Sequence, residues 1–248
     1  MTLFQTLSIL GIGGAAGLCA LHYLIVGQRA PKPALGRLSV PRYNLWERFL
    51  HLVLLATFLV LAVTSFWASI GWGGPMEGYC LMIHTTCGAV FAVAVAAMLI
   101  TWAADHAFGA HDFRWLCRGG CCSTRGDLPA GRFNAGEKIY FWVAGLATLV
   151  LLLTMLLSMI HLLGTDGQHL MYDLHRYVAL ALMIATIWHT YATVVAKPGG
   201  LTAIARGRVT AGWAQRYHPL WGAEAREAPT DKPDEAEEPA ADADTATP

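Results

Sequence analysis

Five long apolar stretches constrain this chain more than any other feature of its sequence. Each is nearly free of charge and long enough to cross a bilayer, which takes about 20 apolar residues in a helix. They run over Leu3–Val26, Phe49–Ile70, Tyr79–Ala104, Ile139–Gly164 and Leu170–Ala196. Only 14% of the 248 residues are charged, against about 25% in soluble domains. The sequence therefore predicts an all-α integral membrane protein.

The positive charges alternate between the connecting segments. Five Lys and Arg residues lie between the first two stretches, none in residues 71–78, five in residues 105–138 and six after Ala196. Positively charged segments remain on the cytoplasmic side. We therefore expect a bacterial inner-membrane protein with a periplasmic N-terminus and a cytoplasmic C-terminus. No Lys or Arg precedes the first stretch, which favours an uncleaved helix over a signal peptide.

The segments outside the spans differ in composition. We expect an N-terminal transmembrane helix in residues 1–28, a cytoplasmic linker in 29–48, a four-helix domain in 49–200, an amphipathic cytoplasmic segment in 201–222 and a disordered acidic tail in 223–248. The amphipathic segment mixes Trp213 and Trp221 with arginines, which favours a position against anionic membrane lipid. Lys+Arg and Asp+Glu both number 17, so no net positive field indicates nucleic-acid binding.

Four intramembrane histidines fall at two matching depths. His175 and His189 are 14 residues apart on the fifth stretch, so both project from nearly the same face, about 21 Å apart along the axis. His51 lies near the start of the second stretch and should be level with His189. His84 lies near the start of the third stretch and should be level with His175.

Each pair, His51 with His189 and His84 with His175, is suited to bind one haem iron from both sides inside a four-helix bundle. Ionisable groups within a membrane are costly and are usually functional. Small residues next to the proposed ligands would leave room for a porphyrin: Thr85, Thr86, Gly88 and Ala192. A lone intramembrane histidine is often only hydrogen-bonded to a neighbouring helix, so the hypothesis depends on four histidines at two depths.

Other candidate sites are weaker. Cys117, Cys121 and Cys122 have a spacing that matches no common metal site, and a cytoplasmic loop would keep them reduced. The absence of CxxC and CxxCH motifs disfavours a zinc ribbon and c-type haem. No Ser, Cys or carboxylate constellation indicates hydrolysis. His106 and His111 are expected in a solvated interface.

Two stretches of sequence carry a family resemblance. The first is RFNAGEK at Arg132–Lys138, and the second runs through His189-Thr-Tyr, Gly207-Arg-Val-Thr, Trp213-Ala and His218-Pro-Leu-Trp221. With the four histidines, these motifs make residues from about Pro41 to Trp221 resemble the gamma subunit of membrane-bound, respiratory formate dehydrogenase, a dihaem cytochrome b. The resemblance implies a four-helix dihaem bundle to which Leu3–Val26 adds one extra helix.

The resemblance also implies roles for individual residues. His51 and His189 would bind the haem near the cytoplasmic face, and His84 and His175 the haem near the periplasmic face. Asn134 and His189 would line a quinone site, although Asn134 also fits the N-cap of the fourth span. The family's usual glutamine is replaced here by Glu137, whose ionisable side chain suggests a part in proton uptake.

By the same resemblance, the chain would carry electrons without a substrate-oxidising site of its own. A periplasmic molybdenum or tungsten catalytic alpha subunit would pass electrons through an iron–sulfur beta subunit to two haem b groups. Menaquinone or ubiquinone would accept them near the cytoplasmic side, in anaerobic respiration. Two alternatives stay open: the same cytochrome serving a hydrogenase or another periplasmic oxidoreductase, and a non-redox membrane anchor or permease.

Overall fold

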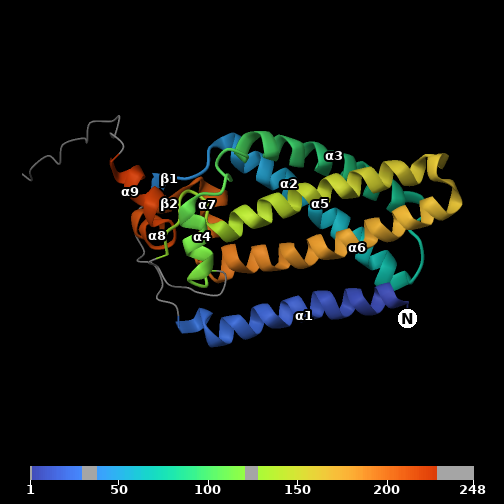
Figure 1. Ribbon diagram of the computed structural model, residues 1–248, viewed down its shortest axis with the longest axis horizontal. Helices are drawn as coiled ribbons and strands as arrows, with labels where there is room; N and C mark the ends of the chain where they lie inside the picture. The colour runs from blue at the N-terminus through green and yellow to red at the C-terminus, as the bar shows by residue number, and fades with distance from the viewer. Residues whose placement is uncertain (1, 30–37, 121–127, 228–248) are drawn as a thin grey trace, which may run out of the picture.

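Long helices form the body of the molecule in the computed structural model, which describes residues 2–29, 38–120 and 128–227. They are α1 (Leu3–Ile25), α2 (Leu45–Phe66), α3 (Gly78–Trp102), α5 (Ala135–Met159) and α6 (Gly164–Thr190) (Figure 1). Two of them continue as π-helical turns, α2 into η2 (Trp67–Trp72) and α6 into η4 (Tyr191–Val195). Five helices in the described part of the chain are long and apolar enough to cross a membrane, which confirms the five predicted spans.

Three spans begin four to six residues earlier than their apolar stretches predict, because polar residues form their first turns. Asn44 caps α2 and Asn134 caps α5, each in a capping box with the glutamate three residues later. These side chains satisfy backbone N–H groups at the helix start that have no partner within the helix. α6 begins at Gly164, where a 3₁₀ turn, η3 (His161–Leu163), ends.

The four helices α2, α3, α5 and α6 form one bundle, and α2, α3 and α5 share an apolar core. α2 lies against α3, α5 against α6, and α3 against α5. The buried side chains of this core are Leu50, Phe91, Ala94, Val95, Met98, Trp102, Phe133 and Phe141. The outer faces of the helices expose large apolar side chains, of which Ile100 is 86% exposed. Such exposure is expected of surfaces that contact lipid.

The additional helix α1 lies along α6, on the outside of the four-helix core (Figure 1). Its Gln5 amide donates to the carbonyl of Ser69 in η2 at 2.9 Å. Near its other end, His22 Nδ1 lies 2.5 Å from the hydroxyl of Tyr191 in η4. After Ile25 the chain continues through a short 3₁₀ turn, η1 (Gly27–Arg29). α1 is thus hydrogen-bonded to the core at both of its ends.

Short elements gather at one end of the bundle, here called the capped end (Figure 1). They are β1 (Leu38–Pro41), α4 (Ala110–Cys117), α7 (Gly200–Arg206), β2 (Arg208–Thr210), α8 (Ala211–Tyr217) and α9 (Pro219–Glu227). β1 and β2 pair antiparallel. The chain therefore closes this end of the bundle with elements that are far apart in sequence.

The capped end corrects the expected surroundings of Trp213, which the sequence placed against lipid. Val209 and Trp213 are only 2% and 4% exposed, and they pack in one cluster with Val40 and Tyr43. The pairing of β1 with β2 brings the segment before α2 against these two side chains, so protein covers them. α9 also continues five residues into the tail predicted to be disordered, and residues 228–248 lie outside the described residues.

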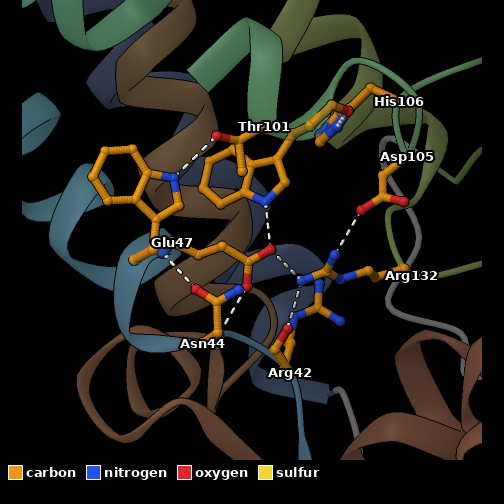
Figure 2. A network of polar contacts seen from close by, with 9 residues as sticks. Arg42, Asn44, Glu47, Thr101, Asp105, His106 and Arg132 are labelled. Atoms are coloured by element: carbon orange, nitrogen blue, oxygen red, sulfur yellow. Dashed lines mark hydrogen bonds and ion pairs between the residues drawn. The ribbon is translucent and has the colours of Figure 1, made fainter. Parts of the chain in front are cut away.

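A polar network joins the capped end to the helix bundle (Figure 2). One carboxylate oxygen of Glu47, at the start of α2, accepts hydrogen bonds from Trp102 Nε1 at 2.7 Å and from Arg132 at 2.6 Å. The Arg132 guanidinium also donates to Asp105 at 2.6 Å and to the Arg42 carbonyl at 2.8 Å. These bonds fix the approach of the chain to Asn134 and α5.

Candidate functional site

The pair of histidines farther from the cap is His84 on α3 and His175 on α6. Their imidazoles are close enough to interact electrostatically. His84 Nδ1 lies 2.7 Å from the hydroxyl oxygen of Thr64, and that hydroxyl also lies 2.8 Å from the Val60 carbonyl. Because the hydroxyl donates its single hydrogen to the carbonyl, it accepts from His84. His84 therefore carries its proton on Nδ1.

His175 is held in the same way from α5. Its Nδ1 lies 3.1 Å from the Thr154 hydroxyl and 3.1 Å from the Leu151 carbonyl. The Thr154 hydroxyl in turn donates to the Val150 carbonyl at 2.8 Å. Both histidines of this pair thus donate from Nδ1 and keep the lone pair of Nε2 for a metal, as haem-ligating histidines do.

The second pair, His51 on α2 and His189 on α6, lies nearer the capped end and also interacts electrostatically. The His189 ring stacks on Tyr140 of α5, with ring centres 4.0 Å apart and planes inclined by 12°. Tyr140 is fixed in turn by a 3.0 Å hydrogen bond between its hydroxyl and that of Thr186. His51 Nδ1 is buried and has no hydrogen-bond partner among the described residues.

The residues at both levels fit a haem better than a bare metal ion. Across the described ranges no group of three or more His, Cys, Asp or Glu side chains is placed to hold a metal. Haem iron needs only two protein ligands, because the porphyrin supplies the other four. Gly88, one turn after His84, leaves space as predicted: an added Cβ would meet no side chain closer than Leu61 at 3.9 Å. Of the Cys-rich loop the structure describes Cys117, which is exposed, while Cys121 and Cys122 lie outside the described residues.

Asn134 has one polar group engaged and one without a partner. Its Oδ1 accepts from the Glu137 backbone N–H at 3.2 Å, which confirms the predicted N-cap and fixes the orientation of the amide. Its Nδ2 is buried and, within the described residues, has no acceptor. Leaving a buried donor unpaired is costly. The geometry therefore favours a ligand with a hydrogen-bond acceptor, such as a carbonyl oxygen, at this position.

Glu137 connects the Asn134 corner with His189. Its carboxylate lies 3.8 Å from the Arg42 guanidinium and accepts from the Asn134 backbone N–H at 3.0 Å. It also interacts electrostatically with His189. Asn134, Glu137 and Tyr140 follow one another at three-residue spacing, so they share one face of α5 over about 9 Å. The structure therefore places Asn134 and His189 at the same end of α5.

Several residues of the site escape prediction from sequence. Tyr140, Thr64 and Thr154 are ordinary intramembrane residues until α5, α2 and the histidines are placed together. The sequence predicted a solvated His106, and this prediction is wrong. The side chain is 3% exposed, and the centre of its ring lies 3.9 Å from that of Phe141. Burial lowers the pKa of His106. Two aromatic residues on α5 and just before it, Phe141 and Phe133, enclose the imidazole.

His218 should make the stability of the capped end sensitive to acid. The ring is fully buried, and its Nδ1 lies 2.8 Å from the Gly131 carbonyl. Burial lowers the pKa of His218 from 6.5 to about 3. Between these values the unfolded chain binds more protons than the folded chain, so the free energy of unfolding falls as pH drops below 6.5.

The variant His218→Asn tests this expectation, because an asparagine amide can still donate to the Gly131 carbonyl. The midpoint of thermal unfolding, followed by tryptophan fluorescence, should fall between about pH 7.5 and about pH 5 in the native protein and fall less in the variant. His106 contributes in the same direction, so some dependence should persist. Equal falls in both proteins would contradict the assignment to His218.

Comparison with known proteins adds independent findings. The profile of the family described as prokaryotic cytochrome b561 matches residues 42–207, a range that contains all four histidines and Asn134. The cytochrome b556(fdo) subunit of formate dehydrogenase from Escherichia coli strain K12 is 25% identical over 203 residues, which cover 76% of this chain and 94% of that protein.

Two further relatives have similar names. The nitrate-inducible formate dehydrogenase cytochrome b556(Fdn) subunit of E. coli is 25% identical over 214 residues, covering 79% of this chain and 96% of the relative. The formate dehydrogenase cytochrome b556 subunit of Haemophilus influenzae is 29% identical over 119 residues, covering 45% and 49% respectively. The family profile matches residues 42–207 and therefore does not include α1.

Proposed function

Because the chain belongs to the prokaryotic cytochrome b561 family, we propose that it is the dihaem cytochrome b subunit of a formate dehydrogenase-like complex. It is a multi-pass membrane protein, and its family implies haem b. The observation that carries the proposal is the position of four histidines at two depths of one four-helix bundle, with His84 and His175 farther from the cap and His51 and His189 nearer to it. The names of the relatives support formate dehydrogenase as the complex.

The four histidines would hold two haem b groups, which supply one-electron transfer when bound. His84 and His175 keep their Nε2 lone pairs available because their Nδ1 protons are donated elsewhere. His51 and His189 would hold the second haem near the capped end.

Quinone reduction is assigned to the capped end, near His189 and Asn134. Reduction of a quinone to a quinol takes two electrons and two protons, and each carbonyl oxygen of the quinone receives one proton. The Asn134 amide would donate a hydrogen bond to one carbonyl and orient the ring. Glu137 would keep the Asn134 side chain in place through the capping box. The buried and unpartnered Nδ2 of Asn134 supports this assignment.

The pattern of positive charge supports a cytoplasmic capped end and a periplasmic opposite end. An iron–sulfur subunit and a molybdenum or tungsten subunit would then deliver electrons from the periplasmic side, in a bacterial inner membrane. Protons for the quinol would come from the cytoplasm. This arrangement separates charge across the membrane with each electron pair.

Asn134→Asp should impair quinone reduction without removing haem. The aspartate still accepts the Glu137 N–H as an N-cap, but it offers no amide donor to a quinone. We expect the rate of quinone reduction with formate as donor to fall about tenfold or more. Both haems of the purified complex should still be reduced by formate.

Asn44→Asp is the matched control, because Asn44 forms the same capping box at the start of α2. It should leave quinone reduction unchanged. A loss of haem in Asn134→Asp, or an equal loss of activity in both variants, would show that Asn134 acts only through the fold. Failure of formate to reduce any haem would argue against the formate dehydrogenase assignment.

A further inference from the structure

The two histidine pairs differ in what holds their rings, and this difference bears on the direction of electron flow. We propose that hydrogen bonds from His84 and His175 lower the reduction potential of the outer haem below that of the inner haem, the one nearer the capped end. Electrons would then move toward the quinone site with a favourable free-energy change. The inference rests on the proposed function, since it takes the four histidines as haem ligands.

The outer pair has a complete set of hydrogen bonds around Nδ1. His84 donates to the Thr64 hydroxyl, and His175 divides its proton between the Thr154 hydroxyl and the Leu151 carbonyl. Such bonds make an imidazole a more basic ligand. A more basic ligand stabilises ferric over ferrous iron, because the ferric ion carries the larger positive charge. The potential at the outer level is therefore lowered.

The inner pair lacks these bonds. His51 Nδ1 is buried without a partner, and His189 is held by its stack on Tyr140; no hydrogen bond to the His189 ring is found in the part of the chain that the structure describes. Stacking orients the His189 ring, but it provides no hydrogen-bond acceptor for Nδ1 and therefore does not make the imidazole a more basic ligand. The ligands at this level are therefore less basic than those at the outer level, and the inner haem has the higher potential.

Nearby charges do not reverse this order. At the inner level Glu137 and Lys197 both act on His189, with opposite signs. At the outer level the nearest charged residues on α6, Asp173 and Arg176, form an exposed ion pair of 2.8 Å. Charges of both signs lie near each level, and the hydrogen bonds to Nδ1 are present at the outer level only.

The electron-transfer step needs no bond to form or break. His84 and His175 would hold the haem that gives up one electron, and His51 and His189 would hold the haem that gains it, so the electron count balances. The periplasmic partner of the proposed complex would supply the next electron at the outer level. Two such transfers supply the two electrons for one quinone.

The test removes the hydroxyls while keeping the shape of the side chains. Thr64→Val should raise the reduction potential of the outer haem. The rise should change the equilibrium constant for sharing an electron between the two haems about tenfold, which corresponds to 59 mV for one electron. Thr154→Val should raise it less, because His175 keeps the Leu151 carbonyl. Redox titration of each variant complex, followed by haem absorbance, measures both potentials.

Two threonines on the same helices provide matched controls. Thr57 on α2 and Thr148 on α5 donate to carbonyls of their own helices, and within the described residues neither is hydrogen-bonded to one of the four histidines. Thr57→Val and Thr148→Val should shift neither potential. The outer haem is identified by combining each variant with His51→Ala, which is expected to leave only that haem.

Several outcomes would overturn the proposal. An outer potential above the inner one in the native complex would do so, as would equal shifts of both haems in Thr64→Val. Unchanged potentials in Thr64→Val with both haems present would show that the hydrogen bond does not tune the site. If the complex held no haem at all, the proposed function itself would fail, and the two results are distinguished by the haem content.

Discussion

His84→Ala and His51→Ala should each leave the complex with one haem b in place of two, and a different haem should remain in each variant. An alanine offers no lone pair to iron, and the remaining histidine of the pair binds haem much more weakly alone. His84→Ala should remove the outer haem, which His175 would also ligate, and His51→Ala should remove the inner haem, which His189 would also ligate. Haem extracted per chain, with the reduced minus oxidised spectrum, measures the loss.

His169→Ala is the control on the same helix as His175. Its side chain is exposed, so the variant should keep both haems and the native spectrum. If His84→Ala and His51→Ala both kept two haems, the histidines would not be the ligands. If both variants lost the same haem, the pairing by depth would be wrong even though the residues were correct.

Much of the bundle could be predicted from sequence because membrane spans are defined by composition. A helix in lipid must be long and apolar whatever it packs against, so hydropathy alone located all five spans. The ends were less accurate, since polar first turns such as Asn44–Glu47 and Asn134–Glu137 do not contribute to an apolar stretch. Their capping boxes are nevertheless readable in the sequence as Asn-x-x-Glu.

The capped end could not be predicted in the same way. Its strand pairing joins Leu38–Pro41 to Arg208–Thr210 across the whole membrane domain. Each strand is only three or four residues long, and neither has a local pattern that requires it to be a strand. Without that pairing, Trp213 looked like a side chain for the lipid surface, whereas it lies in the cap core and contacts Arg42 by a cation–π interaction at 4.9 Å.

The candidate site was partly accessible from sequence, for a geometric reason. A straight helix fixes depth by residue count, so His175 and His189 could be matched with histidines of other spans before any contact was known. Rotation about each helix axis is not fixed by counting. The hydrogen bonds of Thr64 and Thr154, and the stack of Tyr140, depend on that rotation and so needed the structure.

The buried ion pair between Lys138 and Asp112 gives the second large expected effect. Lys138 Nζ lies 2.7 Å from the Asp112 carboxylate and 2.8 Å from the Ala107 carbonyl, and both side chains are almost completely buried. Lys138→Met should destabilise the protein by about 3–5 kcal/mol, because it leaves the Asp112 charge buried without its partner. The free energy of unfolding in detergent, from denaturant titration, measures the effect.

The double variant Lys138→Met with Asp112→Asn separates charge from packing. Asparagine can still accept the Gly109 N–H that caps α4, but it leaves no charge to compensate. The double variant should therefore recover much of the lost stability. Arg176→Met breaks an exposed ion pair instead and should change stability by no more than about 1 kcal/mol. If the double variant were as unstable as Lys138→Met alone, the lysine would stabilise the α4–α5 contact mainly by filling space, and the buried charge would not be the cause.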